Sequence, residues 1–173
     1  MQDIIIKLLE ESDTQNLFIF ELKNRSFFEK TCLPRGDEYY ELESFKEIIK
    51  ELVEEQKNDI VYMYLIKDLK GKVIGRINIT SIQRGSFNKA ELGYRIGKDY
   101  QGKGVATNAV KIVLEKALKE HKLHRIEAGT NSNNIGSQIV LIKNGFQFVG
   151  RYNKYIYQGD KWHDSILFER VLD

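Results

Sequence analysis

The stretch Gln101-Gly102-Lys103-Gly104-Val105-Ala106 is the most informative part of the chain for its fold, because a long amphipathic helix pattern starts directly behind it. Its two glycines allow a tight turn and let the backbone approach a ligand, since no Cβ stands in the way. A loop that leads into a helix presents unpaired N–H groups and the positive end of the helix dipole. This stretch therefore predicts a seat for an anion, usually a phosphate.

Three strand-like segments precede the loop. Residues 61–67 are rich in β-branched and aromatic side chains, and residues 73–82 alternate between two faces. Residues 90–96 form the third segment, and turn-forming residues at 68–71 and 84–86 separate the three. They predict an antiparallel meander that leads into the loop.

Helix and strand patterns alternate after the loop. Apolar residues at helical spacing predict a helix over about 107–121 with one buried stripe. The remaining segments are a strand at 125–129, a helix at 134–143 that Asn144-Gly145 ends in the left-handed manner, and strands at 146–157 and 162–172 joined by a Gln158-Gly159-Asp160 hairpin. The chain thus ends in two long strands that pair with each other.

The N-terminal part has a less regular pattern. Residues 4–9 read as a strand, and the run Ser12-Asp13-Thr14 caps a short helix that continues to residue 22. Residues 24–41, which hold the only proline of the chain, are predicted as a loop or a broken helix. A charged amphipathic helix is expected over 44–56. The whole order of elements predicts a mixed sheet with a few helices, an α+β or open α/β layout.

Length and composition describe one globular domain over residues 1–173, with a net charge of +2. So small a charge argues against nucleic acid or a membrane as the main partner. The single cysteine, Cys32, excludes an internal disulfide, and the scattered histidines lack metal-site spacing, so no metal is predicted. With no signal peptide and no membrane-length apolar stretch, a cytoplasmic location is expected.

Other interpretations of the glycine loop fit less well. A Walker-type phosphate loop needs Ser or Thr after Gly-Lys, but Gly104 follows Lys103, which excludes it. A dinucleotide fingerprint needs a third glycine where Thr107 stands and a parallel strand before the loop. A helix cap that binds nothing remains an alternative for an isolated Gly-x-Gly pattern.

The context of the loop resembles the GNAT superfamily of N-acetyltransferases, in the branch that contains the RimJ and RimL ribosomal-protein N-terminal acetyltransferases. Gln-x-x-Gly-x-Ala after a strand is similar to the family's acetyl-CoA pyrophosphate loop. Further similar stretches are Glu91–Gly97 as the strand before the loop, Leu123–Ala128 as the strand after it, Asn134–Ser137 with Gly145-Phe146 as the helix across the cofactor, and Tyr157, Gly159, Asp160 and Asp164 as the closing hairpin. The resemblance runs from about residue 60 to the end, with a looser fit before that.

This resemblance implies the GNAT fold, a mixed and mostly antiparallel central sheet with splayed strands, flanked by helices. It also implies acetyl-CoA as cosubstrate and no metal. By resemblance, pantetheine pairs with the backbone of Tyr94, Arg95 and Ile96, while Asn134 adds a bond to it. The pyrophosphate would lie on the amides of Gln101, Gly102, Lys103, Gly104, Val105, Ala106 and Thr107. Lys98 and Lys103 either add positive charge near the phosphates or are solvated surface lysines.

Two residues are candidates for the chemistry. Glu91 is placed as general base on the strand that leads to the loop, with a surface carboxylate as the alternative. Ser137 is placed as proton donor to the departing thiolate, with a helix-capping role beside Asn134 as the alternative. The chain departs from the family at two positions, where Leu141 replaces the tyrosine that many members use as acid and Ile156 replaces a glutamate of some RimL-type enzymes.

For the acceptor, the resemblance favours the α-amine of a protein N-terminus, acetylated directly in a ternary complex. A small-molecule acetyltransferase for a polyamine, amino sugar or amino acid stays open, as does a non-catalytic acetyl-CoA-binding protein. Two features bear on the acceptor. An acidic cluster either attracts a cationic acceptor or is a solvated helix start with acids near the positive end of the dipole, and it is formed by Asp37, Glu38, Glu41 and Glu43. Aromatic residues either wall an acceptor groove or pack in the core, namely Tyr39, Tyr40, Tyr152, Tyr155, Tyr157 and Trp162. An exposed edge strand near the C-terminus suggests a homodimer.

Overall fold

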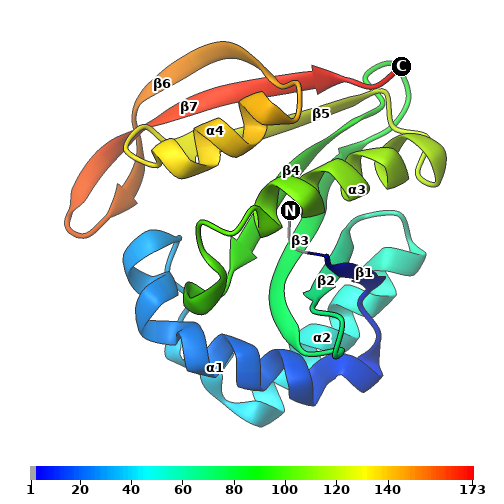
Figure 1. The fold of residues 1–173 in the computed structure, drawn as a ribbon, viewed down its shortest axis with the longest axis vertical. Coiled ribbons are helices and arrows are strands. Elements are labelled where there is room, and N and C mark those ends of the chain that lie inside the picture. The colour runs from blue at the N-terminus through cyan, green and yellow to red at the C-terminus, as the bar shows by residue number, and fades with distance from the viewer. Residues whose placement is uncertain (1–2) are drawn as a thin grey trace.

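Seven strands form one sheet in the order β1-β2-β3-β4-β5-β7-β6 (Figure 1). The computed structural model describes residues 3–173. Its strands are β1 (Ile5–Leu8), β2 (Tyr62–Lys67), β3 (Val73–Gln83), β4 (Lys89–Ile96), β5 (Arg125–Asn131), β6 (Gln147–Gln158) and β7 (Lys161–Val171). Its α-helices are α1 (Thr14–Thr31), α2 (Leu42–Lys57), α3 (Val105–Lys119) and α4 (Ile135–Lys143).

The strands β4 and β5 part from each other along their length. They are the one parallel pair among the strands of residues 3–173, and they pair only where Lys89–Glu91 faces Arg125–Glu127. All other neighbouring strands are antiparallel. Beyond Glu91 the β4 edge that faces β5 has no ladder partner, which confirms the predicted mixed, mostly antiparallel sheet with splayed strands.

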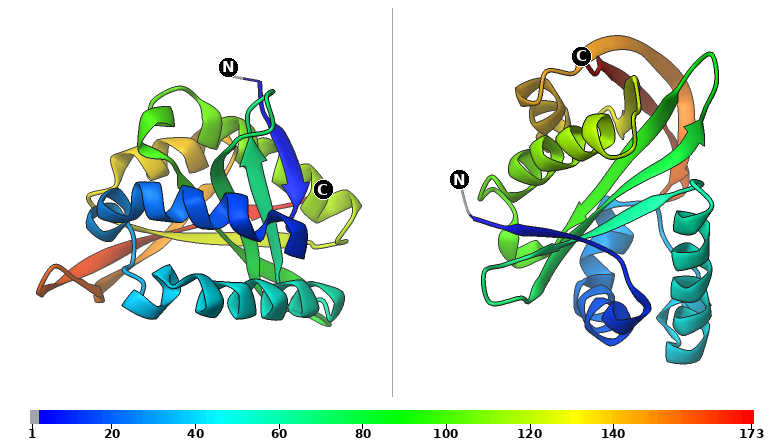
Figure 2. Two further views of the ribbon diagram at one scale, coloured as in Figure 1. Left: turned by 90° about the horizontal axis from the view of Figure 1, so that it is seen from below. Right: turned by 90° about the vertical axis from the view of Figure 1, so that its right-hand side faces the viewer.

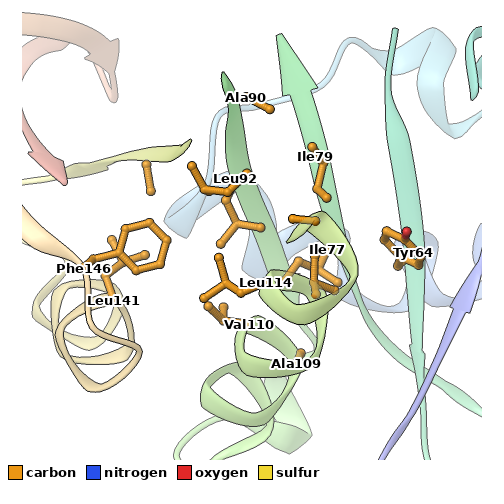
Figure 3. Close-up of a cluster of buried hydrophobic side chains, with 14 of the residues drawn as sticks. Tyr64, Ile77, Ile79, Ala90, Leu92, Ala109, Val110, Leu114, Leu141 and Phe146 are labelled. Atoms are coloured by element: carbon orange, nitrogen blue, oxygen red, sulfur yellow. The ribbon is translucent and has the colours of Figure 1, made fainter. Parts of the chain in front are cut away.

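Helices cover both faces of the sheet. α3 and α4 lie on one face and α1 and α2 on the other, as the edge-on view shows (Figure 2). The larger apolar core packs one face of the sheet against α3 and α4, with Ile77, Leu92, Val110 and Leu141 in its middle (Figure 3). A second, aromatic-rich core lies under α1 and α2. The splay between β4 and β5 therefore lies between these two helical layers.

The turns and the meander follow the sequence prediction closely. β2, β3 and β4 form the expected antiparallel meander. Gly145 ends α4 with a φ of +77°, and Gly159 and Asp160 turn the β6–β7 hairpin with φ values of +58° and +59°. The helix expected over 107–121 begins two residues earlier, at Val105.

The prediction of a loop or broken helix over 24–41 is wrong for residues 24–31, because α1 continues to Thr31. Asn24 donates from Nδ2 to the Phe20 carbonyl (2.9 Å), and Thr31 donates to the Phe27 carbonyl (2.8 Å), so neither side chain breaks the helix. Phe28 is buried against the sheet and holds this last part of α1 in place. Tertiary packing therefore extends the helix until Cys32 adopts extended backbone angles.

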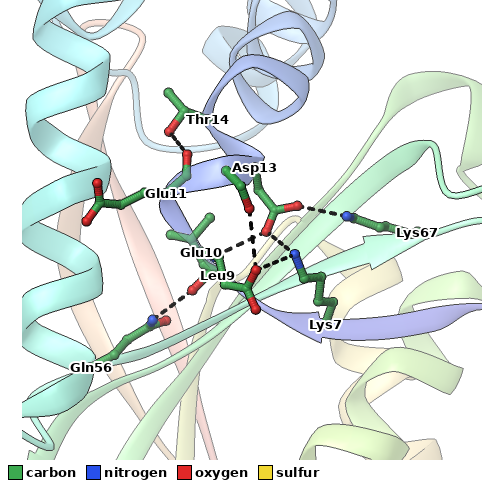
Figure 4. Close-up of polar contacts among 9 residues, drawn as sticks. Lys7, Leu9, Glu10, Glu11, Asp13, Thr14, Gln56 and Lys67 are labelled. Atoms are coloured by element: carbon green, nitrogen blue, oxygen red, sulfur yellow. Dashed lines mark hydrogen bonds and ion pairs between the residues drawn. The ribbon is translucent and has the colours of Figure 1, made fainter.

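A buried carboxylate holds the start of α1 against β1 and β2 (Figure 4). Asp13 accepts bonds from Lys7 at 2.7 Å and from Lys67 at 2.8 Å. Burial on its own would raise the pKa of Asp13, but the bonds from Lys67 and Lys7 outweigh it and hold the pKa below its ordinary value. On the α2 side, Gln56 donates to the Leu9 carbonyl at 3.0 Å. The corner thus sets the position of α1 over the sheet.

No helix within residues 3–173 is both long and apolar enough to cross a membrane.

Candidate active site

The glycine loop joins β4 to α3 in the conformation that an anion seat requires. Gly102 and Gly104 have φ values of +71° and +77°, and Gly104 is the N-cap of α3. No side chain caps this helix, so the first backbone amides of α3 have neither a helical nor a capping acceptor. Gln101 donates from Nε2 to the Ile96 carbonyl (2.7 Å), and this bond ties the loop to the end of β4.

A cavity of about 760 Å³ extends from this loop through the splay to the end of α1 and the β6–β7 hairpin. It brings most of the predicted cofactor residues together. Those that line it are Tyr94, Arg95, Ile96, Gln101, Gly102, Gly104, Val105, Ala106, Thr107 and Asn134, and the catalytic candidate Ser137 lines it as well. Lys103 is not among the lining residues and donates instead to the Asp99 carbonyl at 2.6 Å.

Two hydroxyl groups meet in the cavity. The Tyr94 phenol oxygen lies 2.9 Å from Ser137 Oγ, which joins β4 to the first turn of α4 across the splay. Asn134 caps α4, since its Oδ1 accepts from the Ser137 amide at 3.1 Å. Burial raises the pKa of the Tyr94 phenol above its ordinary value, against the lowering effect of its bond to Ser137. The phenol therefore keeps its proton at neutral pH and can act as a hydrogen-bond donor.

Glu91 lies outside this cavity, on the other face of β4. It is the last β4 residue that pairs with β5, where its Cα partner is Glu127, and its side chain is exposed. Side chains alternate along a strand, so Glu91 shares a face with Arg95 while Tyr94 points to the opposite face, toward α4. The structure thus places the two catalytic candidates at the splay but on opposite sides of the sheet.

The face that carries Glu91 has open space at the splay. Gly93 stands between Glu91 and Arg95, and a Cβ built on Gly93 would meet no atom within 4 Å. Its Cα partner on β3 is Asn78, whose Oδ1 is buried and has no hydrogen-bond partner among residues 3–173. Open space beside an unpaired polar atom is what a bound polar group would fill.

Contacts between the hairpin and α1 bring further residues to the cavity that sequence patterns did not indicate. Gln158 donates from Nε2 to the Cys32 carbonyl at 2.7 Å, and both residues line the cavity together with His163 and Phe28. Cys32 also packs against the aromatic-rich core. No local signal announces such a contact, because it joins residues 126 positions apart.

None of the four acidic residues of the predicted acceptor rim lines the cavity. Asp37 pairs with Arg25, and Glu43 pairs with Lys46 at 2.6 Å. Of the predicted aromatic wall, Tyr39 and Tyr40 are buried, whereas the hairpin residues Tyr152, Tyr155, Tyr157 and Trp162 are exposed. Within the described chain, no three His, Cys, Asp or Glu side chains are grouped to hold a metal ion.

Comparison with known proteins agrees with this geometry. A model of the acetyltransferase (GNAT) domain matches residues 3–147. The probable N-acetyltransferase YjcK of Bacillus subtilis (strain 168) is 35% identical over 162 residues, which cover 93% of this chain and 90% of YjcK. The [ribosomal protein uS5]-alanine N-acetyltransferase of Escherichia coli (strain K12) is 27% identical over 166 residues, 95% of this chain and 85% of that protein.

A solved structure gives the same result for the fold. The crystal structure of ribosomal-protein-S5-alanine acetyltransferase from Vibrio fischeri superposes with a TM-score of 0.94 at 28% identity, over 100% of this chain and 95% of that one. The family match covers most of the chain, and its glycine loop, splayed strands and cavity agree with the match. The protein therefore belongs to the GNAT family of N-acetyltransferases.

Proposed function

We propose that this enzyme transfers the acetyl group of acetyl-CoA directly to the α-amine of a protein N-terminus, of the ribosomal-protein type. One observation carries the proposal: a single cavity contains the glycine loop, passes the splay and reaches the hairpin and the end of α1. A donor and an acceptor would therefore meet at the splay from two sides. The similarity to uS5-alanine N-acetyltransferases over nearly the whole chain supports a protein N-terminus as acceptor.

The loop residues fit the cofactor by their conformation. Two glycines with positive φ and an uncapped helix N-terminus direct free amides to one point, where they would hold the pyrophosphate. We assign Gln101 through Thr107 to this role, and the unpaired edge of β4 at Tyr94, Arg95 and Ile96 to pantetheine. Asn134 is assigned a further bond to pantetheine. Acetyl-CoA, when bound, supplies the acetyl group as an activated thioester.

Ser137 is assigned as the proton donor to the departing sulfur. Its hydroxyl faces the cavity beside Tyr94, whose phenol keeps its proton and would replace the proton that Ser137 gives up. This pair offers a donor in the absence of the usual family tyrosine, where Leu141 stands buried. The chain thus achieves general acid catalysis from β4 and α4 together.

Glu91 is assigned as the base that accepts the proton of the attacking amine. It is exposed at the apex of the splay, on the face from which an acceptor would enter. An α-amine has a pKa near 8, so about a tenth of it is neutral at pH 7, whereas a lysine ε-amine near 10.4 is almost wholly charged. A modest exposed base is therefore better matched to an α-amine than to a lysine.

The test is an amine panel, with free thiol release from acetyl-CoA as readout and mass spectrometry of the product. The panel contains peptides with free N-termini, polyamines, amino sugars and amino acids. Fast turnover of the peptides with α-amine acetylation is expected. Turnover confined to a polyamine, amino sugar or amino acid would overturn the proposal in favour of a small-molecule acetyltransferase. Thiol release that no amine of the panel accelerates would favour a non-catalytic acetyl-CoA-binding protein.

A further inference from the structure

Two arginines lie beside one buried carboxylate on the face of β4 that carries Glu91, and a third arginine, Arg35, is close enough to interact with them electrostatically. Glu21 of α1 is fully buried and lies 3.0 Å from Arg76 Nε and 3.8 Å from Arg95 Nη1. Arg76 and Arg95 are Cα partners on β3 and β4, so their side chains leave the sheet side by side on one face. We call Arg35, Arg76 and Arg95 the arginine cluster.

Arg35 completes the cluster from the segment that follows α1. It is exposed, and its guanidinium lies 5.0 Å from the centre of the Tyr39 ring. No carboxylate among residues 3–173 forms an ion pair with it. Desolvation of its guanidinium, together with repulsion from Arg76 and Arg95, lowers the pKa of Arg35. Arg35 is therefore an exposed cation that has no carboxylate partner among the described residues.

Three positive charges face one negative charge in this cluster. Arg76 and Arg95 also make poor hydrogen bonds to Glu21. Arg76 Nε, Arg95 Nη1 and both carboxylate oxygens of Glu21 are buried atoms that have no well-aligned partner in the described chain. Partly desolvated charges of one sign are costly unless an opposite charge approaches them. Guanidinium groups match a carboxylate best, because they donate two parallel bonds to it.

Arg95 is the member of the cluster that lines the cavity, whereas Arg35 and Arg76 are not among its lining residues. Arg95 lines the cavity near the end of α1, where its Nη2 donates to the Leu33 carbonyl at 2.8 Å. Next to it on the same face lies the open space at Gly93, with the unpaired Oδ1 of Asn78 beside it. The glycine loop, by contrast, presents its amides at the start of α3, which covers the other face.

We propose that the arginine cluster binds a carboxylate of the acceptor, so that this enzyme prefers amines whose molecule also carries an acidic group. The inference rests on the proposed function, because it names the chemistry of the acceptor at the same site. Asn78 Oδ1 would accept a hydrogen bond from an N–H of the acceptor near its amine. The proposal differs from the expectation that the acidic residues at 37–43 attract a cationic acceptor.

The spacing of the site favours an acidic side chain in a peptide over the carboxylate of a free amino acid. Glu91 and Arg95 are four residues apart on β4, which separates their Cα atoms by about 13 Å. An amine at Glu91 and a carboxylate at the cluster would then belong to different residues of the acceptor.

The test compares matched acceptors at saturating acetyl-CoA. One arm uses peptides that differ only by Asp or Glu against Asn or Gln at positions two to four, and the other uses amino acids against their amides. The kcat/KM of acidic peptides is expected to exceed that of neutral ones by about 10-fold or more, as for charge-assisted hydrogen bonds. Equal values in both arms would overturn the proposal, and an advantage only in the amino-acid arm would assign the carboxylate to a free amino acid.

Single substitutions test whether the arginine cluster causes the preference for acidic peptides. Arg35 is exposed, so Arg35→Gln should fold normally, and it is expected to lower kcat/KM for acidic peptides far more than for neutral ones. Lys50→Gln is the matched control, since it removes an exposed positive charge from α2 whose nearest carboxylate, in Glu47, is 3.8 Å away. An acidic preference that survives Arg35→Gln, or falls equally in Lys50→Gln, would contradict the cluster's role.

A separate measurement keeps the inference distinct from the proposed function. The same peptides with a trimethylated α-amine cannot be acetylated, so their binding to the enzyme saturated with CoA is measured by calorimetry. Tighter binding of acidic peptides supports the cluster even if no peptide is ever acetylated. Acetylation of peptides without any acidic preference in binding or rate supports the proposed function and rejects the cluster.

Discussion

The Tyr94 phenol oxygen of β4 lies 2.9 Å from Ser137 Oγ of α4, across the gap where β4 and β5 have parted. The contact exists because strand alternation turns Tyr94 toward α4, and because Asn134 fixes the first turn of that helix. The contact links β4 to α4 beyond Glu91, where β4 no longer pairs with β5. The splay therefore brings two hydroxyl groups within hydrogen-bond distance of each other.

Removal of either hydroxyl should slow the chemical step. Ser137→Ala is expected to lower kcat by about 10²-fold, the usual contribution of a positioned general acid. Tyr94→Phe keeps the ring and loses only the phenol oxygen, so a smaller loss is expected. In the double variant the losses should not add, because both groups serve one proton transfer. Single-turnover kinetics with acetyl-CoA measures all three.

Acyl donors with more acidic thiols provide the control for this pair. Their thiolates leave without a proton, so they should restore much of the rate of Ser137→Ala. Full turnover of Ser137→Ala with acetyl-CoA itself would exclude the acid role and leave Ser137 as a helix-cap residue.

Glu91→Gln should lower the rate most at low pH and leave acetyl-CoA binding intact. At low pH less of the amine is neutral, so the reaction depends more on a group that accepts its proton. The pH dependence of kcat/KM for the acceptor, together with the Kd of acetyl-CoA, measures both effects. A pH–rate profile identical to that of the unmodified enzyme would remove Glu91 from the mechanism.

Gly102→Ala should weaken acetyl-CoA binding by about 5-fold or more, because a Cβ at positive φ costs about 1 kcal/mol or more. The position has φ +71° and no atom within 4 Å of a built Cβ, so backbone strain alone is tested. Gly36→Ala is the matched control, since Gly36 has φ −62° and equally open surroundings. Equal acetyl-CoA affinity in both variants would deny the loop its role as the anion seat.

Asp13→Asn should lower the free energy of unfolding at neutral pH by about 3 kcal/mol, as expected when one partner of a buried ion pair is removed. The folded pKa of Asp13 lies below its ordinary value of 3.8, so its contribution is present above that pH and is lost as the pH falls through the folded value. Chemical denaturation at pH 7 and at pH 3 measures the difference between the variant and the unmodified chain. A stability difference of the same size at both pH values would contradict this linkage.

The elements that sequence predicted well are those whose signal is local. The period-two alternation of residues 73–82 predicted β3, and Asn144-Gly145 predicted the end of α4, since both depend on neighbouring residues alone. The end of α1 was missed because its stability comes from Phe28 against the sheet. Helix propensity does not report such tertiary packing.

The residues of the candidate site also fall into those that a local sequence pattern predicts and those that only tertiary contacts bring together. The glycine loop and the Asn134–Ser137 turn were predicted, because contiguous residues form them. Contacts between distant segments were not, since Cys32 meets Gln158 only through the hairpin and Arg76 meets Arg95 only through strand register. Proximity in sequence likewise did not bring the acidic residues at 37–43 to the lining of the cavity.

The central claim is tested most directly by one peptide that carries a free α-amine, an acidic side chain among its first residues and a single internal lysine. The peptide is incubated with enzyme and acetyl-CoA, and fragmentation by mass spectrometry locates the acetyl group. The account predicts acetylation of the α-amine with the lysine left free. Acetylation of the lysine, or no acetylated peptide under conditions where the enzyme acetylates a polyamine, would contradict it.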